Sequence, residues 1–153
     1  MVPSPLTHSW PLVEERQRFG LGLLFDAPAE ALVLPEFDAE RLAAQGIGLW
    51  ECDLVQDNAL NWTAGVYDLF GLPRDAALDR DEIAALYAEP SRVAMERLRA
   101  HAIKHRRGFT LDAEIVPVTG PRRWMRLIAA PVCVGRHAVR LRGIKQDVSA
   151  VYR

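Results

Sequence analysis

Residues 46–72 constrain the fold most, because two strand patterns and a helix pattern follow one another there without a break. In residues 49–54 apolar side chains alternate with acidic ones, which is typical of a strand with one buried and one solvent-facing side. A polar turn, Gln-Asp-Asn, follows, and the alternation then resumes. We therefore expect a hairpin whose buried side carries both of its tryptophans, Trp50 and Trp62.

A short helix is predicted directly after this hairpin. Thr63 is a suitable N-cap residue, and Gly71 stands where a helix commonly ends in a residue with positive φ. The residues between them that gather on one side of the helix are Val66, Tyr67, Leu69 and Phe70. This side is expected to pack across the hairpin.

Two more short helices are expected on either side of this unit. Asp38 is placed to cap a helix at residues 39–45. Asp79, followed three residues later by Glu82, has the form of a capping box and starts a helix that runs to about residue 87.

The second half of the chain changes from helical to strand periodicity. A longer helix begins near Pro90, and Gly108 is expected to stop it. Strand patterns then cover residues 109–115, 124–130 and 139–146, with turn residues between them. Together with the first hairpin they predict an α+β fold, in which helices cover one face of a five-stranded antiparallel sheet.

The order GIGLWECDL, a turn, LNW and YDLFGL resembles the opening of PAS sensory domains whose first strand carries a tryptophan. The segment RLRGIKQDVS is similar to the last PAS strand with its closing triplet, here Asp147, Val148 and Ser149. The resemblance covers residues 39–149. It leaves residues 1–38 as an N-terminal extension and residues 150–153 as a stub where an output helix would begin.

The same resemblance implies how the strands are arranged. The first strand is expected to pair with the last, which would bring the two acidic residues of the first strand close to Arg140 and Arg142. Trp50 and Trp124 are expected on the same side of the sheet. In PAS domains the closing triplet passes movement from the sheet to the segment that follows, so Asp147, Val148 and Ser149 are predicted to transmit a signal.

Charge is divided unevenly along the chain. Residues 1–90 carry 5 basic and 16 acidic side chains, whereas residues 91–153 carry 14 basic and 4 acidic ones. Either early acidic elements pair with late basic strands inside one fold, or a basic surface faces an acidic partner. Nucleic acid is not expected as a partner, because the sequence has neither interleaved exposed aromatic residues nor a helix-turn-helix pattern.

The sequence predicts a soluble cytoplasmic protein. Its N-terminus lacks the basic start of a signal peptide, and its longest apolar run is too short to cross a bilayer, so no membrane association is expected. Cys52 and Cys133 are the only cysteines, which suits a reducing compartment and offers neither a disulfide framework nor paired metal-ligand spacing.

No enzymatic activity, metal site or cofactor is predicted. The sequence has no glycine-rich phosphate loop, zinc motif or nucleophile elbow, so no residue is assigned a catalytic role. The Asn-Cys-Arg-Phe motif of flavin-binding relatives is missing, and Cys52 is expected to be a buried structural residue. His101 and His105 share one helix face and are weak candidates for a haem ligand, but their basic neighbours favour solvated histidines.

The resemblance also implies where a ligand would lie, which is between the sheet and the third helix. The side chains expected around that space are Trp50, Trp62, Tyr67, Phe70, Leu98, Trp124, Leu141 and Lys145. Lys145 either reaches solvent from the end of the sheet, which we expect, or binds an acidic ligand. The space itself is either a closed, packed interior or a pocket for an unknown small molecule, and packing is expected because small domains have few voids.

The outer face of the sheet is the second candidate site. The residues expected there are Met125, Leu127, Ile144 and Val148. The extension has apolar clusters at residues 21–25 and 31–34 and a helix pattern at residues 12–19. It either covers this face of its own domain or of a twin subunit, or recognises a partner, or stays disordered.

These observations predict a PAS-type signal-transduction module of a bacterium that acts through protein-protein interaction and homodimerisation. Its partner is expected to be a sensor histidine kinase of a two-component system or a second-messenger enzyme. The alternative is a sensor that holds haem or a small organic acid in the inner pocket.

Overall fold

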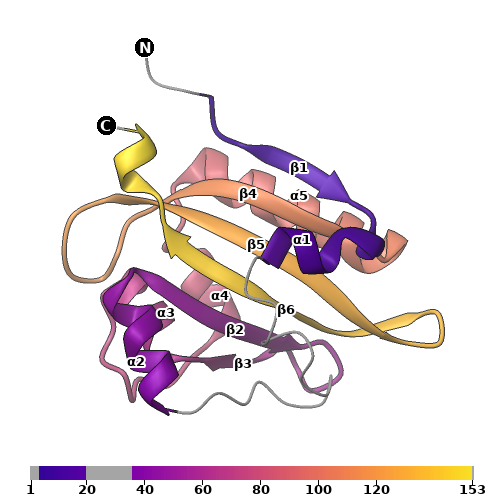
Figure 1. The fold of residues 1–153 in the computed structure, drawn as a ribbon, viewed down its shortest axis with the longest axis horizontal. Helices are drawn as coiled ribbons and strands as arrows, with labels where there is room; N and C mark the ends of the chain where they lie inside the picture. The colour runs from indigo at the N-terminus through magenta and orange to yellow at the C-terminus, as the bar shows by residue number, and fades with distance from the viewer. Residues whose placement is uncertain (1–3, 20–35, 153) are drawn as a thin grey trace.

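The computed structural model of the chain describes residues 4–19 and 36–152. The strands are β1 (Thr7–Trp10), β2 (Ile47–Asp53), β3 (Ala59–Trp62), β4 (Gly108–Ile115), β5 (Arg123–Val134) and β6 (His137–Asp147). The helices are α1 (Glu15–Phe19), α2 (Glu36–Ala44), α3 (Ala64–Phe70), α4 (Arg80–Ala84) and α5 (Glu89–His105), with 3-10 turns η1 (Leu12–Glu14) and η3 (Ser149–Tyr152). All six strands form one antiparallel sheet in the order β1-β4-β5-β6-β2-β3 (Figure 1).

The predicted first hairpin is confirmed. Trp50 of β2 lies directly opposite Trp62 of β3, so both indoles face the same side. Thr63 is the N-cap residue of α3, but its hydroxyl accepts a hydrogen bond from the backbone N–H of Leu49 at 2.8 Å, which ties the helix to the sheet. Gly71 ends α3 with φ 65°, as its position predicted.

Asp79 is confirmed as the N-cap residue of α4, although this helix ends at Ala84 and not near residue 87, and the N-cap predicted for α2 is wrong. The Asp79 carboxylate accepts hydrogen bonds from the backbone N–H groups of Asp81 and Glu82, which satisfies the first turn of α4. Helix α2 begins at Glu36, so Asp38 lies inside the helix and does not cap it. Acidic residues are favoured in the first turn as well as at the cap, and sequence alone does not separate the two positions.

The longest helix, α5, begins at Glu89 with Pro90 at its start, close to the predicted position. Its left-handed terminal residue is Arg106, with φ 54°, so the prediction that Gly108 stops the helix is wrong. Gly108 opens β4, where an added Cβ would lie 2.4 Å from the ring of Trp10. This glycine is therefore needed for packing of the N-terminal segment.

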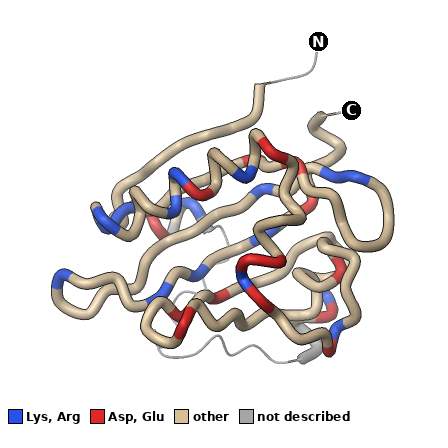
Figure 2. The backbone as a smooth tube through the Cα atoms, turned by 180° about the vertical axis from the view of Figure 1, so that it is seen from behind, with Lys and Arg blue, Asp and Glu red and all other residues tan. Residues whose placement is uncertain are grey.

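The predicted pairing of the first core strand with the last is confirmed. In the register of β2 with β6, Glu51 lies opposite Arg142 and Asp53 lies opposite Arg140. Arg140 approaches Glu51 at 3.9 Å, and Arg142 approaches Glu15 of α1 at 3.6 Å. Early acidic elements thus meet late basic strands within one fold, and Figure 2 shows basic positions along α5 and the late strands.

The sixth strand, β1, comes from the N-terminal extension and pairs with the edge of β4. Trp10, which is 0% exposed, donates from its indole Nε1 to Thr110 Oγ1 at 3.1 Å. Its ring belongs to an outer cluster that also contains Leu49, Ile128, Ala130 and Ile144. Residues 4–19 therefore dock on the domain itself, whereas the apolar clusters at 21–25 and 31–34 lie outside the described residues.

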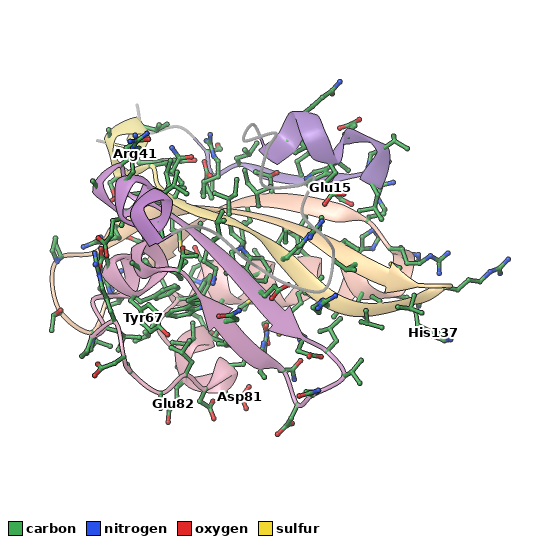
Figure 3. All side chains as sticks on the ribbon, turned by 60° about the horizontal axis from the view of Figure 1, so that its bottom comes forward. Glu15, Arg41, Tyr67, Asp81, Glu82 and His137 are labelled. Atoms are coloured by element: carbon green, nitrogen blue, oxygen red, sulfur yellow. The ribbon has the colours of Figure 1, made fainter. Side chains whose placement is uncertain are left out.

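The two faces of the sheet carry separate layers. Figure 3 shows Glu15 of α1 on one side and Asp81 and Glu82 of α4 on the other. The inner layer joins the first hairpin to α3, α4 and α5 and forms the main core. The outer layer is the smaller cluster under residues 10–12, with Leu42 and Ile47 at its margin.

The face assigned to β5 from sequence is wrong by one residue. Met125 and Leu127 belong to the inner core, not to the outer interaction face. Trp124 lies on the outer side, stacked on Tyr152 with 4.4 Å between ring centroids, so Trp50 and Trp124 are on opposite faces. Because both faces of β5 are covered, both sets of alternating residues are mostly apolar, and alternation does not reveal which set points inward.

Substitution of Gly65 tests how closely α3 packs on β2. A Cβ added at Gly65 would lie 2.0 Å from the carbonyl oxygen of Ile47. Helix propensity alone favours Gly65→Ala by about 1 kcal/mol, but overpacking against rigid backbone costs about 1–3 kcal/mol. We expect chemical denaturation to show a lower free energy of unfolding for Gly65→Ala, and a more stable variant would contradict this packing.

Candidate functional site

A cavity of about 50 Å³ lies between the inner face of the sheet and helices α4 and α5. Its apolar lining comes from both layers and consists of Trp50, Leu60, Ile83, Ala84, Met95, Phe109, Leu127 and Leu141. Its polar lining consists of Cys52, Arg80, Tyr87, Arg99 and Lys145. The interior is therefore mostly packed, as expected, but it retains a small polar void.

Lys145 is the most unusual group in this cavity. It lies on β6 between Gly48 of β2 and Leu127 of β5 and is only 7% exposed. The expectation that it reaches solvent from the end of the sheet is therefore wrong. Its side chain lines the cavity instead.

Three aromatic rings surround the Lys145 ammonium. Its Nζ lies 5.2 Å from the ring centroid of Trp50, 5.5 Å from that of Trp62 and 5.1 Å from that of Phe70. Ring faces attract a cation, and each desolvated contact contributes roughly 2 kcal/mol at best. No hydrogen-bond acceptor or carboxylate within the described residues reaches this nitrogen.

Burial without an anionic partner lowers the pKa of Lys145 from 10.5 to about 7. Desolvation is the main cause, Cys52 acts in the opposite direction, and the Arg80 guanidinium lowers the pKa further. A shift of this size corresponds to a cost on the order of 5 kcal/mol for holding the charged form in the fold. The rings thus compensate for only part of the lost hydration.

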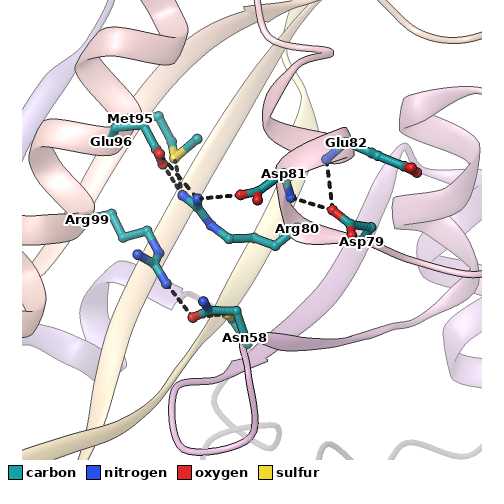
Figure 4. Close-up of polar contacts among 9 residues, drawn as sticks. Asn58, Asp79, Arg80, Asp81, Glu82, Met95, Glu96 and Arg99 are labelled. Carbon is teal, nitrogen blue, oxygen red and sulfur yellow. Dashed lines mark hydrogen bonds and ion pairs between the residues drawn. The ribbon is translucent and has the colours of Figure 1, made fainter.

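Arg80 and Arg99 bring two more positive charges to the lining (Figure 4). Arg80 pairs with Glu96 of α5 and approaches Asp81 at 3.6 Å. Arg99 donates to the Asn58 side-chain oxygen at 2.8 Å. Both guanidinium groups are half-buried and fixed by these partners.

Asn58 also connects the cavity to the turn of the first hairpin. Its side-chain oxygen accepts from the Cys52 thiol at 3.8 Å as well as from Arg99. Asn58 adopts φ 58°, a conformation that asparagine tolerates better than most residues. Cys52 is buried, as predicted, but it lines the cavity, so its position is not purely structural.

Two buried indole groups near Lys145 lack hydrogen-bond partners. Neither Trp50 Nε1 nor Trp62 Nε1 finds an acceptor among the described residues. Trp62 is held in place by stacking on Phe70 at 5.3 Å and by an edge contact with Tyr67 at 5.2 Å. A buried donor without an acceptor costs about 1–3 kcal/mol, so these groups favour an acceptor from outside the described residues.

Most of the predicted pocket residues do come together. Trp50, Leu141 and Lys145 line the cavity, and Trp62 and Phe70 surround the Lys145 ammonium. Tyr67 and Leu98 pack at the margin of the core. Trp124 is wrongly placed, because it faces the outer side.

Arg80, Arg99, Tyr87 and Met95 were not predicted from sequence as site residues. Arg80 follows the N-cap of a helix, where a cation is unfavourable next to the helix dipole. A basic residue at this position was the feature of the sequence that could have indicated a role in the site. Burial raises the pKa of Tyr87, so its hydroxyl stays protonated and able to donate. The inward direction of Arg99 depends on the position of the hairpin turn. No pattern in the sequence around Arg99 indicates this direction.

The outer face and the closing triplet form a second group of predicted residues. Ile144 lies in the outer cluster, and Val148 is buried at the end of β6. Asp147 accepts from the backbone N–H of Ser149 at 2.8 Å, and the Ser149 hydroxyl accepts from the N–H of Trp124 at 3.0 Å. The triplet therefore fastens the end of β6 to the start of β5.

The residues after the triplet turn back over the outer face as η3. The Tyr152 hydroxyl donates to Asp112, whose buried carboxylate also receives two bonds from Arg126 at 2.8 and 2.9 Å. Residues 150–152 thus continue the fold in place of the expected stub.

The predicted haem candidates lie elsewhere. His101 and His105 are exposed on α5 with 4.5 Å between ring centroids, and neither lines the cavity. Within residues 4–19 and 36–152, no group of three or more His, Cys, Asp or Glu side chains is placed to hold a metal ion. None of the helices described is long and apolar enough to cross a membrane.

No protein-family model matches the sequence, and no curated protein matches it. Solved structures do share its fold. The N-terminal domain of a diguanylate cyclase with PAS/PAC sensor from Marinobacter aquaeolei is 14% identical, with a TM-score of 0.63, over 70% of this chain and 99% of that one.

Two larger proteins are also similar over part of their length. An RNA-binding light-oxygen-voltage receptor is 12% identical with a TM-score of 0.61, over 70% of this chain and 30% of its own. The blue-light activated histidine kinase EL346 of Erythrobacter litoralis is 22% identical with a TM-score of 0.59, over 73% of this chain and 36% of its own. This chain thus spans about a third of each, and it has the fold of PAS domains.

The ionisation of Lys145 is directly measurable, because Lys104 and Lys145 are the two lysines of the chain. In a buffer free of small anions, lysine-selective NMR should show one side chain that titrates near pH 7, which is Lys145. Lys104 is exposed on α5 and serves as the internal reference. The absence of a lysine signal that titrates near pH 7 would contradict the buried position of Lys145.

The same group makes stability depend on pH. The folded pKa of Lys145, about 7, lies below the unfolded value of 10.5, so the unfolded chain binds more protons between these values. The destabilisation is complete below pH 7 and absent above pH 10.5. Relative to Lys145→Met, the free energy of unfolding of the wild type should rise by about 2–3 kcal/mol between pH 6 and pH 9. Parallel pH profiles of the two proteins in urea denaturation would contradict this.

Proposed function

We propose that this chain is a sensory signal-transduction module that acts through protein-protein contacts at the outer face of its sheet. The observation that carries this proposal is the apolar cluster on that face, which is covered by the chain's own N-terminal segment through Trp10. A buried apolar patch with a separable cover is suited to exchanging one partner for another. The module works by contact and not by chemistry.

The cover is held by few interactions compared with the inner core. Strand β1 is four residues long and pairs with one edge strand. Its further attachments include the Trp10 indole, two bonds from Arg107 to Ser9 at 2.9 and 3.3 Å, one from the Asp112 N–H to the Leu6 carbonyl at 2.8 Å, and the contact of Glu15 with Arg142. Segments with few buried contacts open at lower free energy than the rest of a domain, so the cover is the part most easily displaced.

The proposed partner is based on the larger proteins in which domains of similar fold occur. The similar structures include part of a diguanylate cyclase and a histidine kinase, which are signalling enzymes that carry such domains. We therefore propose a sensor histidine kinase or a second-messenger enzyme of the bacterial cytoplasm as the regulated partner. A second copy of this chain could bind the same outer face of the sheet, and this would give a homodimer.

A second candidate function is ligand sensing in the inner cavity. It is favoured by Lys145, a buried cation that lines the cavity without an anionic partner among the described residues. The two functions are compatible, because the cavity and the cover lie on opposite faces of the same strands. Haem is the weaker ligand, since His101 and His105 stand outside the cavity lining.

The Trp10→Ala variant tests the cover. Removing a buried tryptophan costs about 3–5 kcal/mol, which exceeds what four strand pairs at an edge supply. Hydrogen exchange should speed up in β1 and η1 while β2 and β6 stay protected, and light scattering should show a shift toward dimers. Val13→Ala, in the same segment at a residue 92% exposed, is the matched control and should change neither.

Two results would count against the cover. If Trp10→Ala left exchange in β1 and the oligomeric state unchanged, the segment would not be acting as a cover. If exchange rose equally in the inner core, the segment would be an integral part of the domain, and the outer face would not be available to a partner.

A further inference from the structure

We infer that the inner cavity is a binding site for a small monovalent anion of the size of acetate, formate or nitrate, held by Lys145. This inference rests on the sensory function proposed above and names its ligand class. Three observations support it: the charges of the residues that line the cavity, two buried indole N–H groups near Lys145 that have no acceptor among the described residues, and the size of the cavity.

The lining carries positive charge without negative charge. Lys145, Arg80 and Arg99 all contribute to it, whereas no aspartate or glutamate of residues 4–19 and 36–152 does. The acidic partners of Arg80 are Glu96 and Asp81, and neither lines the cavity. Cationic groups on a low-dielectric wall attract an anion and repel a cation.

The donors around Lys145 outnumber the acceptors. Trp50 Nε1 and Trp62 Nε1 have no acceptor among the described residues, and both rings lie within 5.5 Å of the Lys145 nitrogen. The Tyr87 hydroxyl is a further buried polar group of the lining. Of these groups, Trp50 and Tyr87 line the cavity together with Lys145. A ligand that offers only acceptors suits such a set of donors, and a small oxyanion has this character.

The volume restricts the ligand. A water molecule needs at least about 10–15 Å³ of such space. A cavity of about 50 Å³ therefore holds roughly three to four non-hydrogen atoms. Formate, acetate and nitrate fit this limit, whereas citrate and benzoate exceed it.

Binding should depend on pH through Lys145. The other charged or titratable groups that face the cavity are Cys52 from β2, Arg80 from α4, Arg99 from α5 and Tyr87 from the connection between the two helices. Despite burial, the pKa of Arg80 is raised by its hydrogen bond to Glu96, and burial keeps Tyr87 protonated, whereas the lowered pKa of Lys145 brings its charge change near neutrality. With a pKa of about 7, its charged fraction falls about thirtyfold between pH 6 and pH 8.5, and the affinity falls with it.

The test is titration of the full chain with sodium acetate, formate and nitrate at constant ionic strength set by a bulky sulfonate buffer. Isothermal calorimetry gives the affinity, and lysine-selective NMR reports the Lys145 signal separately from Lys104. We expect saturable binding at pH 6, a shift of the Lys145 signal alone, and affinity weaker by about thirtyfold at pH 8.5.

Two variants and two classes of compound provide the controls. Lys145→Met keeps an unbranched apolar chain among the three rings and should bind acetate at least tenfold more weakly, while Lys104→Met should bind as the wild type does. Ethylammonium matches acetate in size and should not bind, and benzoate should bind at least tenfold more weakly than acetate.

Equal acetate binding by the wild type and Lys145→Met would overturn the site, as would the absence of binding at pH 6. The experiment also distinguishes failure of the anion site from failure of the proposed sensory function. Acetate binding that leaves the amide exchange of β1 unchanged would support the anion site and overturn its role in signalling. Binding accompanied by faster exchange in β1 would support both.

Discussion

The structure depends on the pairing of β2 with β6, because these two strands form both surfaces on which function is proposed. On the inner face, Trp50 lies opposite Gly143, and its indole lies beside Lys145. On the outer face, Leu49 lies opposite Ile144 and forms the floor under Trp10. Ile144 and Lys145 are neighbours in sequence that point to opposite faces, so a displacement of β6 at the cavity is carried directly to the outer cluster.

Features determined by local sequence were predictable. The first hairpin, the glycine that ends α3 and the Asp79 cap depend on a few neighbouring residues, and the structure contains each of them. The face of β5 was not predictable, because the strand is apolar on both sides under two covering layers. The error in Trp124 and Leu127 follows from this ambiguity and not from a different fold, since β6 still pairs with β2 as expected.

Only part of the candidate site could be predicted from the sequence. The register of the last strand places Lys145 on the same side as Leu141, so its inward direction could be read from the alternation. Its environment could not, because the rings around it come from β2, β3 and α3, which are about 75 to 95 residues away. That no carboxylate of the described residues lines the cavity is a property of the assembled fold, and no single segment encodes it.

The two described ends of the chain lie near each other in Figure 1, and this arrangement bears on how a signal would leave the domain. The N-terminal segment is fixed by Trp10 over β4, and the C-terminal turn is fixed by Tyr152 on the Asp112–Arg126 pair. Each attachment involves strands β4 and β5. Strand β6 leads directly into the C-terminal turn, which forms the second attachment. A shift of β6 against β5 therefore acts on the C-terminal turn through Asp147 and Ser149, and on the N-terminal cover through Ile144. Because the inner core is larger and more densely connected, the outer attachments are the first to yield to such a shift.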